Sequence, residues 1–406
     1  MRGKPIRVLL VEDNPTDVLL VRATLAAAVN PRFTVVNTDR LTTALDLMKS
    51  DQFDVILLDL GLPDAQGIES FNRAQAVAGD TPIIVLSGLG DERIAMRAVN
   101  HGAQDFLPKA ERLDELLPRS IRYAMERNRA RIALRRSAME LRRKNQELVD
   151  ELKMAREIQQ ALLPHNYPVF SGNHNALRFA HCYRPAAALS GDFFSILRLA
   201  DSKAGVLICD VMGHGVRAAL IGTLARGLVD QFMPTADQPG KFLASLNSEL
   251  SQTFKKGGID AFATAFYFVV DLTEQRISFA NAGHPHALVV RRDENVVDWL
   301  RVDGRGKPPL GLLNDTEYPT FESKLCSHDS ILLFTDGLFE AENNNGERFG
   351  RNRLLNAVSA RQNLPCERLL GELVHESQRF TGRQDFMDDV CLVGMDVVSA
   401  VEPCAA

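Results

Sequence analysis

The segment between Pro118 and Pro164 most constrains what this chain can fold into, because it contains no glycine and no internal proline. Leucine or alanine recurs in it every seven residues, at Leu134, Leu141, Leu148, Ala155 and Leu162. The second seam is less apolar and holds Ala138, Asn145, Leu152 and Gln159. This heptad pattern predicts one long helix that can pair as a short two-stranded coiled coil. A helical linker, residues 118–164, therefore separates an N-terminal domain, residues 1–117, from a C-terminal domain, residues 165–399.

The first half of this linker is strongly basic, with ten Arg or Lys against two Glu in residues 119–144. We interpret it as a solvated helical face. A nucleic-acid-binding arm is the alternative, but no series of aromatic residues alternates with the basic ones. The net charge of −5 also gives no general nucleic-acid footprint. We therefore expect no nucleic-acid partner.

Two further features bear on the class of protein. No apolar stretch reaches the roughly 18 residues that a transmembrane helix needs, so we expect no membrane partner. The six cysteines are scattered and form no Cys-x-x-Cys pair. This usage is typical of reduced thiols in a cytoplasmic protein and argues against a zinc site.

The N-terminal domain alternates short apolar runs with amphipathic stretches. The apolar runs predict five strands, at residues 6–11, 33–36, 54–59, 82–87 and 105–107. Helical patterns separate them, at residues 15–29, 41–49, 67–77 and 91–100. This alternation predicts an α/β domain with a five-stranded, doubly wound parallel sheet that is covered on both faces.

Polar residues follow the ends of these strands, namely Glu12, Asp13, Asp59, Ser87 and Lys109. Ligands of open parallel sheets lie outside the carboxyl ends of the strands, so we expect the five residues to share one pocket. The three carboxylates can hold Mg²⁺. Asp59 would be the nucleophile towards a phosphoryl group, and Lys109 and the Ser87 hydroxyl would bind the acyl phosphate.

The C-terminal domain has a different sequence pattern, in which strand-like apolar runs follow one another as in β-hairpins. These runs lie at residues 205–210, 261–271, 276–280, 287–291, 330–335 and 390–395. Helical patterns lie at residues 215–233, 241–255, 351–360 and 366–379. The mixture predicts an α+β domain.

Four short motifs of this domain carry carboxylates close to strand-like runs, at Asp192, Asp210, Asp336 and the pair Asp388 and Asp389. One such motif alone is a weak signal, because Asp residues at strand ends commonly cap turns. Clustered carboxylates repel one another unless cations neutralise them. Four motifs in one domain therefore predict a divalent metal site, and hydrolysis as the chemistry that it supports.

The N-terminal domain resembles the response-regulator receiver family over its full length. The matching stretches are residues 10–14, 54–64, 85–88 and 106–109. The resemblance implies that Asp59 accepts phosphate from a partner histidine kinase. It also implies that Phe106 is the aromatic switch residue, with a packed core phenylalanine as the alternative.

Residues from about 157 to 398 resemble the metal-dependent PPM-type serine/threonine phosphatases, in particular the bacterial branch typified by SpoIIE and RsbU. The matching stretches are residues 156–164, 280–285, 309–311, 334–343 and 346–350. The resemblance implies a β-sandwich flanked by helices and a centre with two Mn²⁺ or Mg²⁺ ions. The sequence departs from many relatives at Ser190, where they have Gly, and at Ser195, where they have Asp.

The same resemblance implies a role for each carboxylate. Asp210 would bridge both ions, Asp336 and Asp388 would complete one ion, and the Val211 carbonyl would reach the other. Asp192 would also belong to the metal site and would orient metal-bound water.

Three neighbouring residues keep two interpretations each. His214 donates to the phosphate or bonds a loop carbonyl. His284 acts in chemistry or ties the turn of residues 281–285, and we favour the turn. Asp389 is a ligand or supports one, and we favour support.

These observations lead to one hypothesis. A sensor histidine kinase phosphorylates Asp59, and the linker then changes its pairing or angle and aligns a protein phosphatase domain. Its substrate would be a phosphorylated anti-sigma factor antagonist, and residues 118–164 would form a homodimer. The alternative is a non-catalytic adaptor that only binds a sigma-factor regulator. Such adaptors tend to lose metal ligands, whereas Asp192, Asp210, Asp336 and Asp388 are all present.

Overall fold

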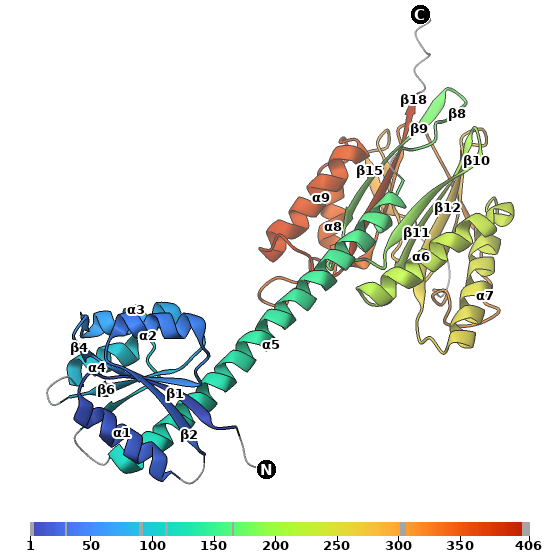
Figure 1. The fold of residues 1–406 in the computed structure, drawn as a ribbon. Coiled ribbons are helices and arrows are strands. Elements are labelled where there is room, and N and C mark those ends of the chain that lie inside the picture. Colours follow the sequence, from blue (N-terminus) through green and yellow to red (C-terminus); the bar gives the residue numbers. More distant parts are fainter. Residues whose placement is uncertain are drawn as a thin grey trace, which may run out of the picture. The chain divides into compact units, whose positions relative to one another are not determined.

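The computed structural model describes residues 4–28, 31–88, 92–109, 113–164, 166–300 and 306–399. Residues 29 and 91, which the sequence predicts as helical, and residue 165 lie outside this range. The chain divides into two compact units between Glu147 and Leu148 (Figure 1).

The first unit is built on a parallel sheet with the strand order β2-β1-β3-β6-β7. Its strands are β1 (Ile6–Val11), β2 (Phe33–Thr38), β3 (Val55–Asp59), β6 (Ile83–Ser87) and β7 (Asp105–Pro108). Its helices are α1 (Pro15–Ala27), α2 (Leu41–Ser50), α3 (Ile68–Ala78), α4 (Glu92–Asn100) and the start of α5 (Leu113–Ala161). The small ribbon β4 (Gly61–Leu62) and β5 (Ala65–Gln66) follows β3. The predicted five-stranded doubly wound sheet is confirmed.

Both faces of this sheet are covered, which explains why its strands read as unbroken apolar runs. Ile56 and Leu58 of β3 pack with α2, α3 and α4 on one face. Val55 and Leu57 pack with α1 and α5 on the other face. Alternate residues of one strand therefore serve two separate cores.

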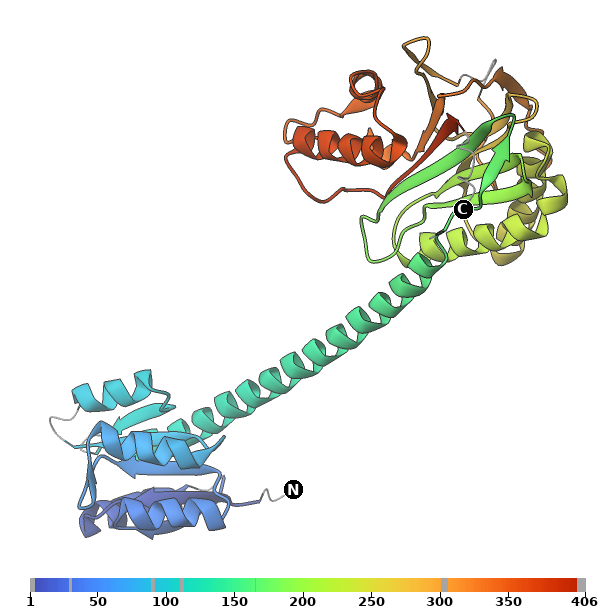
Figure 2. The same cartoon turned by 90° about the horizontal axis from the view of Figure 1, so that it is seen from above.

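Helix α5 is one unbroken helix and begins before Pro118 (Figure 2). Its first turns are buried on the sheet of the first unit, from Leu113 to Asn128. The heptad leucines beyond are exposed, with Leu134 at 73% and Leu141 at 61%. A row of exposed leucines is what an unpaired coiled-coil seam presents, so the coiled coil stays a prediction that needs a second chain.

The second unit contains two antiparallel sheets with the strand orders β10-β11-β12-β13-β16 and β15-β14-β17-β18-β9-β8. The first sheet comprises β10 (Phe193–Ala200), β11 (Lys203–Val211), β12 (Ala263–Asp271), β13 (Arg276–Ala282) and β16 (Phe321–Lys324). The second comprises β8 (Phe170–Gly172), β9 (Asn175–Arg184), β14 (Leu288–Arg291), β15 (Val296–Trp299), β17 (Ser330–Phe334) and β18 (Val390–Ser399). The helices are α6 (Val216–Gln231), α7 (Pro239–Gly257), α8 (Gly350–Ser359) and α9 (Cys366–Thr381), with short 3₁₀ turns η1 (Met233–Thr235) and η2 (Asp336–Leu338).

These elements form four layers. Helices α6 and α7 lie against the first sheet, and α8 and α9 lie against the second (Figure 1). A third apolar core fills the space between the sheets. Strand β11 shows the cause, because Leu207 and Cys209 face the helices while Val206 and Ile208 face the other sheet. The resemblance to a β-sandwich flanked by helices is confirmed.

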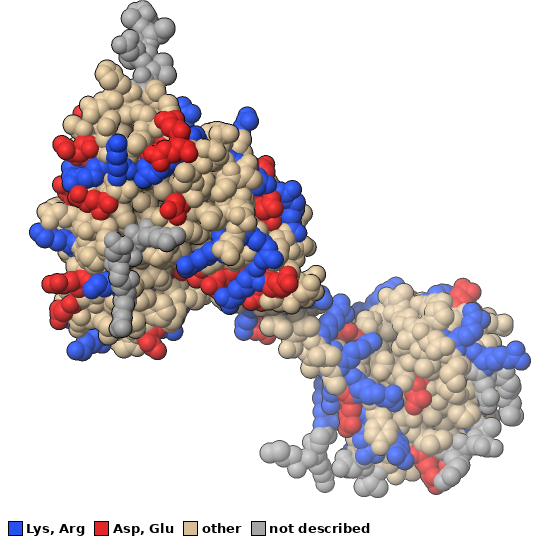
Figure 3. Space-filling view, turned by 180° about the vertical axis from the view of Figure 1, so that it is seen from behind, with Lys and Arg blue, Asp and Glu red and all other residues tan. Residues whose placement is uncertain are grey.

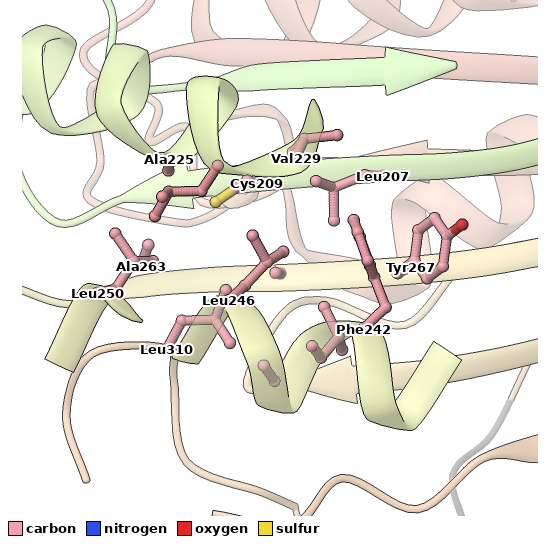
Figure 4. Packing of buried hydrophobic residues seen from close by; sticks show 14 of the residues in the cluster. Leu207, Cys209, Ala225, Val229, Phe242, Leu246, Leu250, Ala263, Tyr267 and Leu310 are labelled. Atoms are coloured by element: carbon pink, nitrogen blue, oxygen red, sulfur yellow. The ribbon is translucent and has the colours of Figure 1, made fainter. Parts of the chain in front are cut away.

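The core under α6 and α7 is anchored by large side chains (Figure 4). Phe242 of α7 is fully buried and its ring centroid lies 4.4 Å from that of Tyr267 on β12. The Tyr267 hydroxyl donates to the Ala236 carbonyl at 2.8 Å, so its polar end is satisfied.

The surface of the second unit carries both signs of charge. Figure 3 shows Lys and Arg side chains intermixed with Asp and Glu side chains on its visible face. Within the described residues, no helix combines the length and the apolar character that crossing a bilayer requires.

The Phe242 packing gives a stability prediction. Phe242→Ala should lower the unfolding free energy of the second unit by about 3–5 kcal/mol, because it opens a cavity that the sheet and α7 cannot collapse to fill. Leu220→Ala, at a position of α6 that is 67% exposed, should change it by no more than about 0.5 kcal/mol. Urea unfolding of both variants measures this, and equal midpoints would contradict the assigned core.

Candidate functional site

The first unit gathers three acidic side chains at the carboxyl ends of β1 and β3. Ligand oxygens of Glu12, Asp13 and Asp59 all lie within 4.8 Å of one another. Glu12 and Asp59 are buried, whereas Asp13 is exposed. An oxygen-only trio that is open on one side suits Mg²⁺, which keeps several waters.

Lys109 reaches into this acidic cluster from the end of β7. Its ammonium lies 2.6 Å from Glu12 Oε2, 3.2 Å from Asp59 Oδ1 and 3.1 Å from Asp17 Oδ2. Burial acts to lower the pKa of Lys109, but the hydrogen bond to Glu12 and the charge of Asp59 outweigh it and raise that pKa. Lys109 is therefore a fixed cation beside Asp59.

Two other predicted residues lie on the neighbouring strands β6 and β7. The Ser87 hydroxyl is buried and has no hydrogen-bond partner within the described part of the chain. The Lys109 amide donates to the Ser87 carbonyl at 2.9 Å, which ties β6 to the segment after β7. Phe106 is half-buried and packs at the edge of the core under α4. Asp17, whose carboxylate contacts Lys109, is a residue of this cluster that the sequence pattern did not indicate.

The carboxylates of the second unit come from both of its sheets. Asp210 is the penultimate residue of β11, and the pairing of Phe193 with Cys209 places Asp192 beside it. On the second sheet Asp336 opens the 3₁₀ turn after β17, and Asp388 stands just before β18. Because β17 and β18 are paired neighbours, these two ends also meet.

The pKa values show how closely these groups interact. Burial, followed by the charge of Asp336, raises the pKa of Asp210 to about 7. Burial and the charges of Asp210 and Asp389 raise the pKa of Asp192 well above its ordinary range. Burial and the charge of exposed Asp388 raise the pKa of Asp336. The four side chains therefore repel one another when ionised.

This arrangement fits divalent cations. The Asp192 Oδ2 atom is buried and makes no hydrogen bond to any described residue. All the donors are oxygens, which hard cations prefer. Among the described residues only Glu12, Asp13 and Asp59 have three ligand atoms as close as 4.8 Å, so the second set is spread more widely. A spread set suits two ions about 3.5–4 Å apart better than one.

Asp389 supports the site by binding backbone. Its Oδ1 accepts from the Ala186 amide at 2.8 Å and its Oδ2 from the Gly191 amide at 3.0 Å. The Thr335 hydroxyl donates to its carbonyl at 3.3 Å. Both carboxylate oxygens are thus engaged with N–H groups beside Asp192, an arrangement that suits a supporting residue.

Glycines allow close approach at the same place. A Cβ on Gly191 would stand 2.9 Å from the Ala218 Cβ and 3.0 Å from the Val211 carbonyl oxygen. A Cβ on Gly222 of α6 would stand 2.7 Å from the Gly191 carbonyl oxygen. Helix α6 therefore packs directly on the segment that carries Asp192.

The two histidines differ in their surroundings. His284 is buried, and burial lowers its pKa to about 3, so it is neutral at physiological pH. Its amide donates to Asn281 Oδ1 at 2.8 Å, and the Asn281 amide group donates to its carbonyl at 2.8 Å. These bonds tie the turn. His214 is exposed beside the start of α6.

Comparison with known proteins finds a matching family model in each unit. Residues 8–120 match the response regulator receiver domain, and residues 200–398 match Stage II sporulation protein E (SpoIIE). Over 191 residues the chain is 29% identical to phosphoserine phosphatase RsbP, and over 208 residues it is 30% identical to phosphoserine phosphatase RsbU, both of Bacillus subtilis (strain 168).

These alignments cover 47% and 51% of this chain and 45% and 58% of the relatives, so the chain spans about half the length of the curated relatives it matches. The solved SiaA-PP2C domain of Pseudomonas aeruginosa matches with a TM-score of 0.53 at 21% identity, covering 62% of this chain and 98% of that one. This match shows a shared fold.

The raised pKa of Asp210 has a consequence for the metal-free protein. A carboxyl group whose folded pKa is raised holds a proton that the unfolded chain has lost, so its contribution to stability falls between about pH 4 and pH 7. In EDTA at pH 8, Asp210→Asn should therefore raise the unfolding free energy by about 1–3 kcal/mol, allowing for coupling among the carboxylates. At pH 5 the gain should be smaller.

Thermal unfolding in EDTA at both pH values measures this effect. The matched control is Asp201→Asn, whose carboxylate is exposed beside Arg198 at the tip between β10 and β11 and should leave stability nearly unchanged. Equal stability of wild type and Asp210→Asn at pH 8 would show that the carboxylates are not forced together.

Proposed function

We propose that this chain, which joins a response regulator receiver domain to a phosphatase domain of the SpoIIE family, is a metal-dependent phosphoserine and phosphothreonine protein phosphatase under receiver control. The observation that carries the proposal is the meeting of Asp192, Asp210, Asp336 and Asp388 at one end of the sandwich, with raised pKa values at the first three. Forced repulsion of this kind suits a site that is completed by cations.

Each residue has a proposed task. Asp210, between Asp192 and Asp336, would contact both of two Mn²⁺ or Mg²⁺ ions, and Asp336 and Asp388 would complete one of them. The Val211 carbonyl would reach the other. When bound, such ions lower the pKa of water and neutralise phosphoryl oxygens.

Asp192 would belong to the ligand set as well, and it has a further task in this proposal. Its buried Oδ2 atom has no partner among the described residues, so it is free to accept a hydrogen bond from water and to orient it for in-line attack. No side chain needs to form a covalent bond to phosphorus. The supporting bonds of Asp389 to the Ala186 and Gly191 amides would hold that geometry.

In the receiver, we infer that Asp59 accepts the phosphoryl group of a sensor histidine kinase, with Mg²⁺ held by Glu12, Asp13 and Asp59. Lys109 already lies 3.2 Å from Asp59 Oδ1 and would bind a phosphoryl oxygen. The buried Ser87 hydroxyl can donate to another, and Phe106 would follow its movement.

The substrate and the assembly are also proposals. The relatives RsbP and RsbU bear the name phosphoserine phosphatase, which supports a phosphoserine substrate here. We propose a phosphorylated anti-sigma factor antagonist in the cytoplasm as that substrate, and a homodimer through residues 118–164. A non-catalytic adaptor that grips a sigma-factor regulator would share the fold but would not need the four carboxylates.

Hydrolysis of an aryl phosphate with Mn²⁺ tests the enzyme. Asp210→Asn should lower kcat/KM by about 100-fold or more, because it removes the carboxylate placed between the others. Asp201→Asn should keep the wild-type rate. Equal rates for wild type and Asp210→Asn would contradict the phosphatase and favour the adaptor.

Sedimentation of the full chain tests the dimer. With beryllofluoride and Mg²⁺, which mimic phosphorylation, wild type should sediment as a dimer because the exposed leucine row of α5 then pairs. Asp59→Asn, which cannot form the aspartyl adduct, is the control for the mimic. A monomer in the presence of beryllofluoride would refute the proposed pairing.

A further inference from the structure

The last turns of α5 are hydrogen-bonded to the backbone beside Asp192. Gln159 Nε2 donates to the Ser190 carbonyl at 2.6 Å, and the Ser190 amide donates to Gln159 Oε1 at 3.2 Å. The Gln159 side-chain amide thus pairs with both the backbone N–H and the backbone C=O of Ser190, as a residue of a neighbouring strand would. The sequence pattern placed Gln159 only at a weak seam position, so this contact is a second use of the residue.

The Ser190–Asp192 segment depends on a few outside contacts of this kind. The Asp192 amide donates back to Ser190 Oγ at 3.1 Å, and the Gly191 amide donates to Asp389. On the strand side, the Tyr183 hydroxyl donates to the Asp192 carbonyl at 3.0 Å. Tyr183 belongs to β9 and Asp389 directly precedes β18, whereas Gln159 is the contact that comes from the helix.

A small cavity next to Asp192 also connects the end of α5 to this segment. A cavity of about 20 Å³ lies between the end of α5, the start of β10 and α6, and Gln159, Leu162, Asp192 and Gly222 are among its lining residues. This volume is close to that of a single water. Leu163 of the next turn packs against the core between the two sheets. The helix end is therefore seated directly behind the Asp192 segment.

We propose that Gln159 is a positioning residue that fixes the Ser190–Asp192 backbone, and through it the place of the Asp192 carboxylate in the metal centre. The inference deepens the proposed function and rests on it for the link to catalysis. Any displacement of the end of α5 would be passed to Asp192 through the two hydrogen bonds between Gln159 and the backbone of Ser190. A site of this kind loses affinity when a ligand moves by about 0.5 Å.

Direct Mn²⁺ binding to the full chain tests the proposal without substrate. Electron paramagnetic resonance of the metal-depleted protein titrated with Mn²⁺ gives the affinity, and Asp210→Asn identifies the signal of the receiver pocket. Gln159→Ala should weaken Mn²⁺ binding at the second unit by about fivefold to tenfold, because two hydrogen bonds to the ligand segment are lost. Gln160→Ala, at the exposed next position of the helix, should stay within about twofold of wild type.

A second variant covers the case in which Gln159→Ala does not fold. Gln159→Glu keeps the length of the side chain but loses the group that donates to the Ser190 carbonyl, so it should weaken Mn²⁺ binding in the same direction. A loss of Mn²⁺ affinity with an unchanged melting temperature separates positioning from a merely structural role. Wild-type affinity in the folded Gln159 variants would overturn the proposal.

The same proteins separate this inference from the proposed function. If wild type hydrolyses aryl phosphate while the Gln159 variants bind Mn²⁺ as wild type does, the positioning role fails and the phosphatase stands. If the variants lose Mn²⁺ affinity while wild type hydrolyses nothing, Gln159 positions a metal ligand in a protein that is not a phosphatase.

Discussion

The mutual repulsion of the carboxylates in the second unit is the constraint on which the rest of that unit depends. Asp192 and Asp210 come from the first sheet, and Asp336 and Asp388 come from the second. Ionised side chains of this kind would separate if the chain could move. The apolar core between the sheets prevents it, since it holds the two sheets together along their length. Stability from the core thus offsets a local cost at the site.

The two units handle crowded acidic groups in different ways. In the first unit Lys109 is built into the cluster and contacts Glu12 and Asp59, so the pocket carries its own cation. In the second unit the described ion pairs include none with Asp192, Asp210 or Asp336, and protons or metal ions must balance the charge. The first cluster therefore contains its own balancing cation, whereas the second depends on positive charge from outside the described side chains.

The elements that could be predicted from the sequence are those whose burial produces a recognisable pattern of apolar residues. Strand β11 was predictable because both of its faces are covered, which produces a continuous apolar run. Strand β9 was not, because polar residues such as Arg178 and His181 interrupt its apolar positions and much of it is only half-buried. Strand β10 was missed because the two residues before it, Gly191 and Asp192, are of types that are common in turns.

The carboxylates at strand ends were predictable for a similar reason, and the side chains that contact their surroundings were not. Asp59, Asp210 and Asp336 stand at strand ends, where a pattern along the chain reveals them. Asp17 and Gln159 act through contacts with residues far along the chain, and Gln159 meets Ser190 across 31 positions. The hydrophobic periodicity of a sequence indicates which face of a helix is apolar. It does not indicate which backbone group a polar side chain contacts.

Glycine within α6 shows how the two requirements of this fold compete. An alanine at position 222 would favour the helix by about 0.8–1 kcal/mol. Its methyl group would stand 2.7 Å from the Gly191 carbonyl oxygen, so the helix would have to withdraw from the peptide next to Asp192. Glycine at this position lowers the helical propensity of α6 but lets the helix approach the Gly191 carbonyl closely. Thermostabilising substitutions chosen from helix statistics alone would select this position and would displace the segment that carries Asp192.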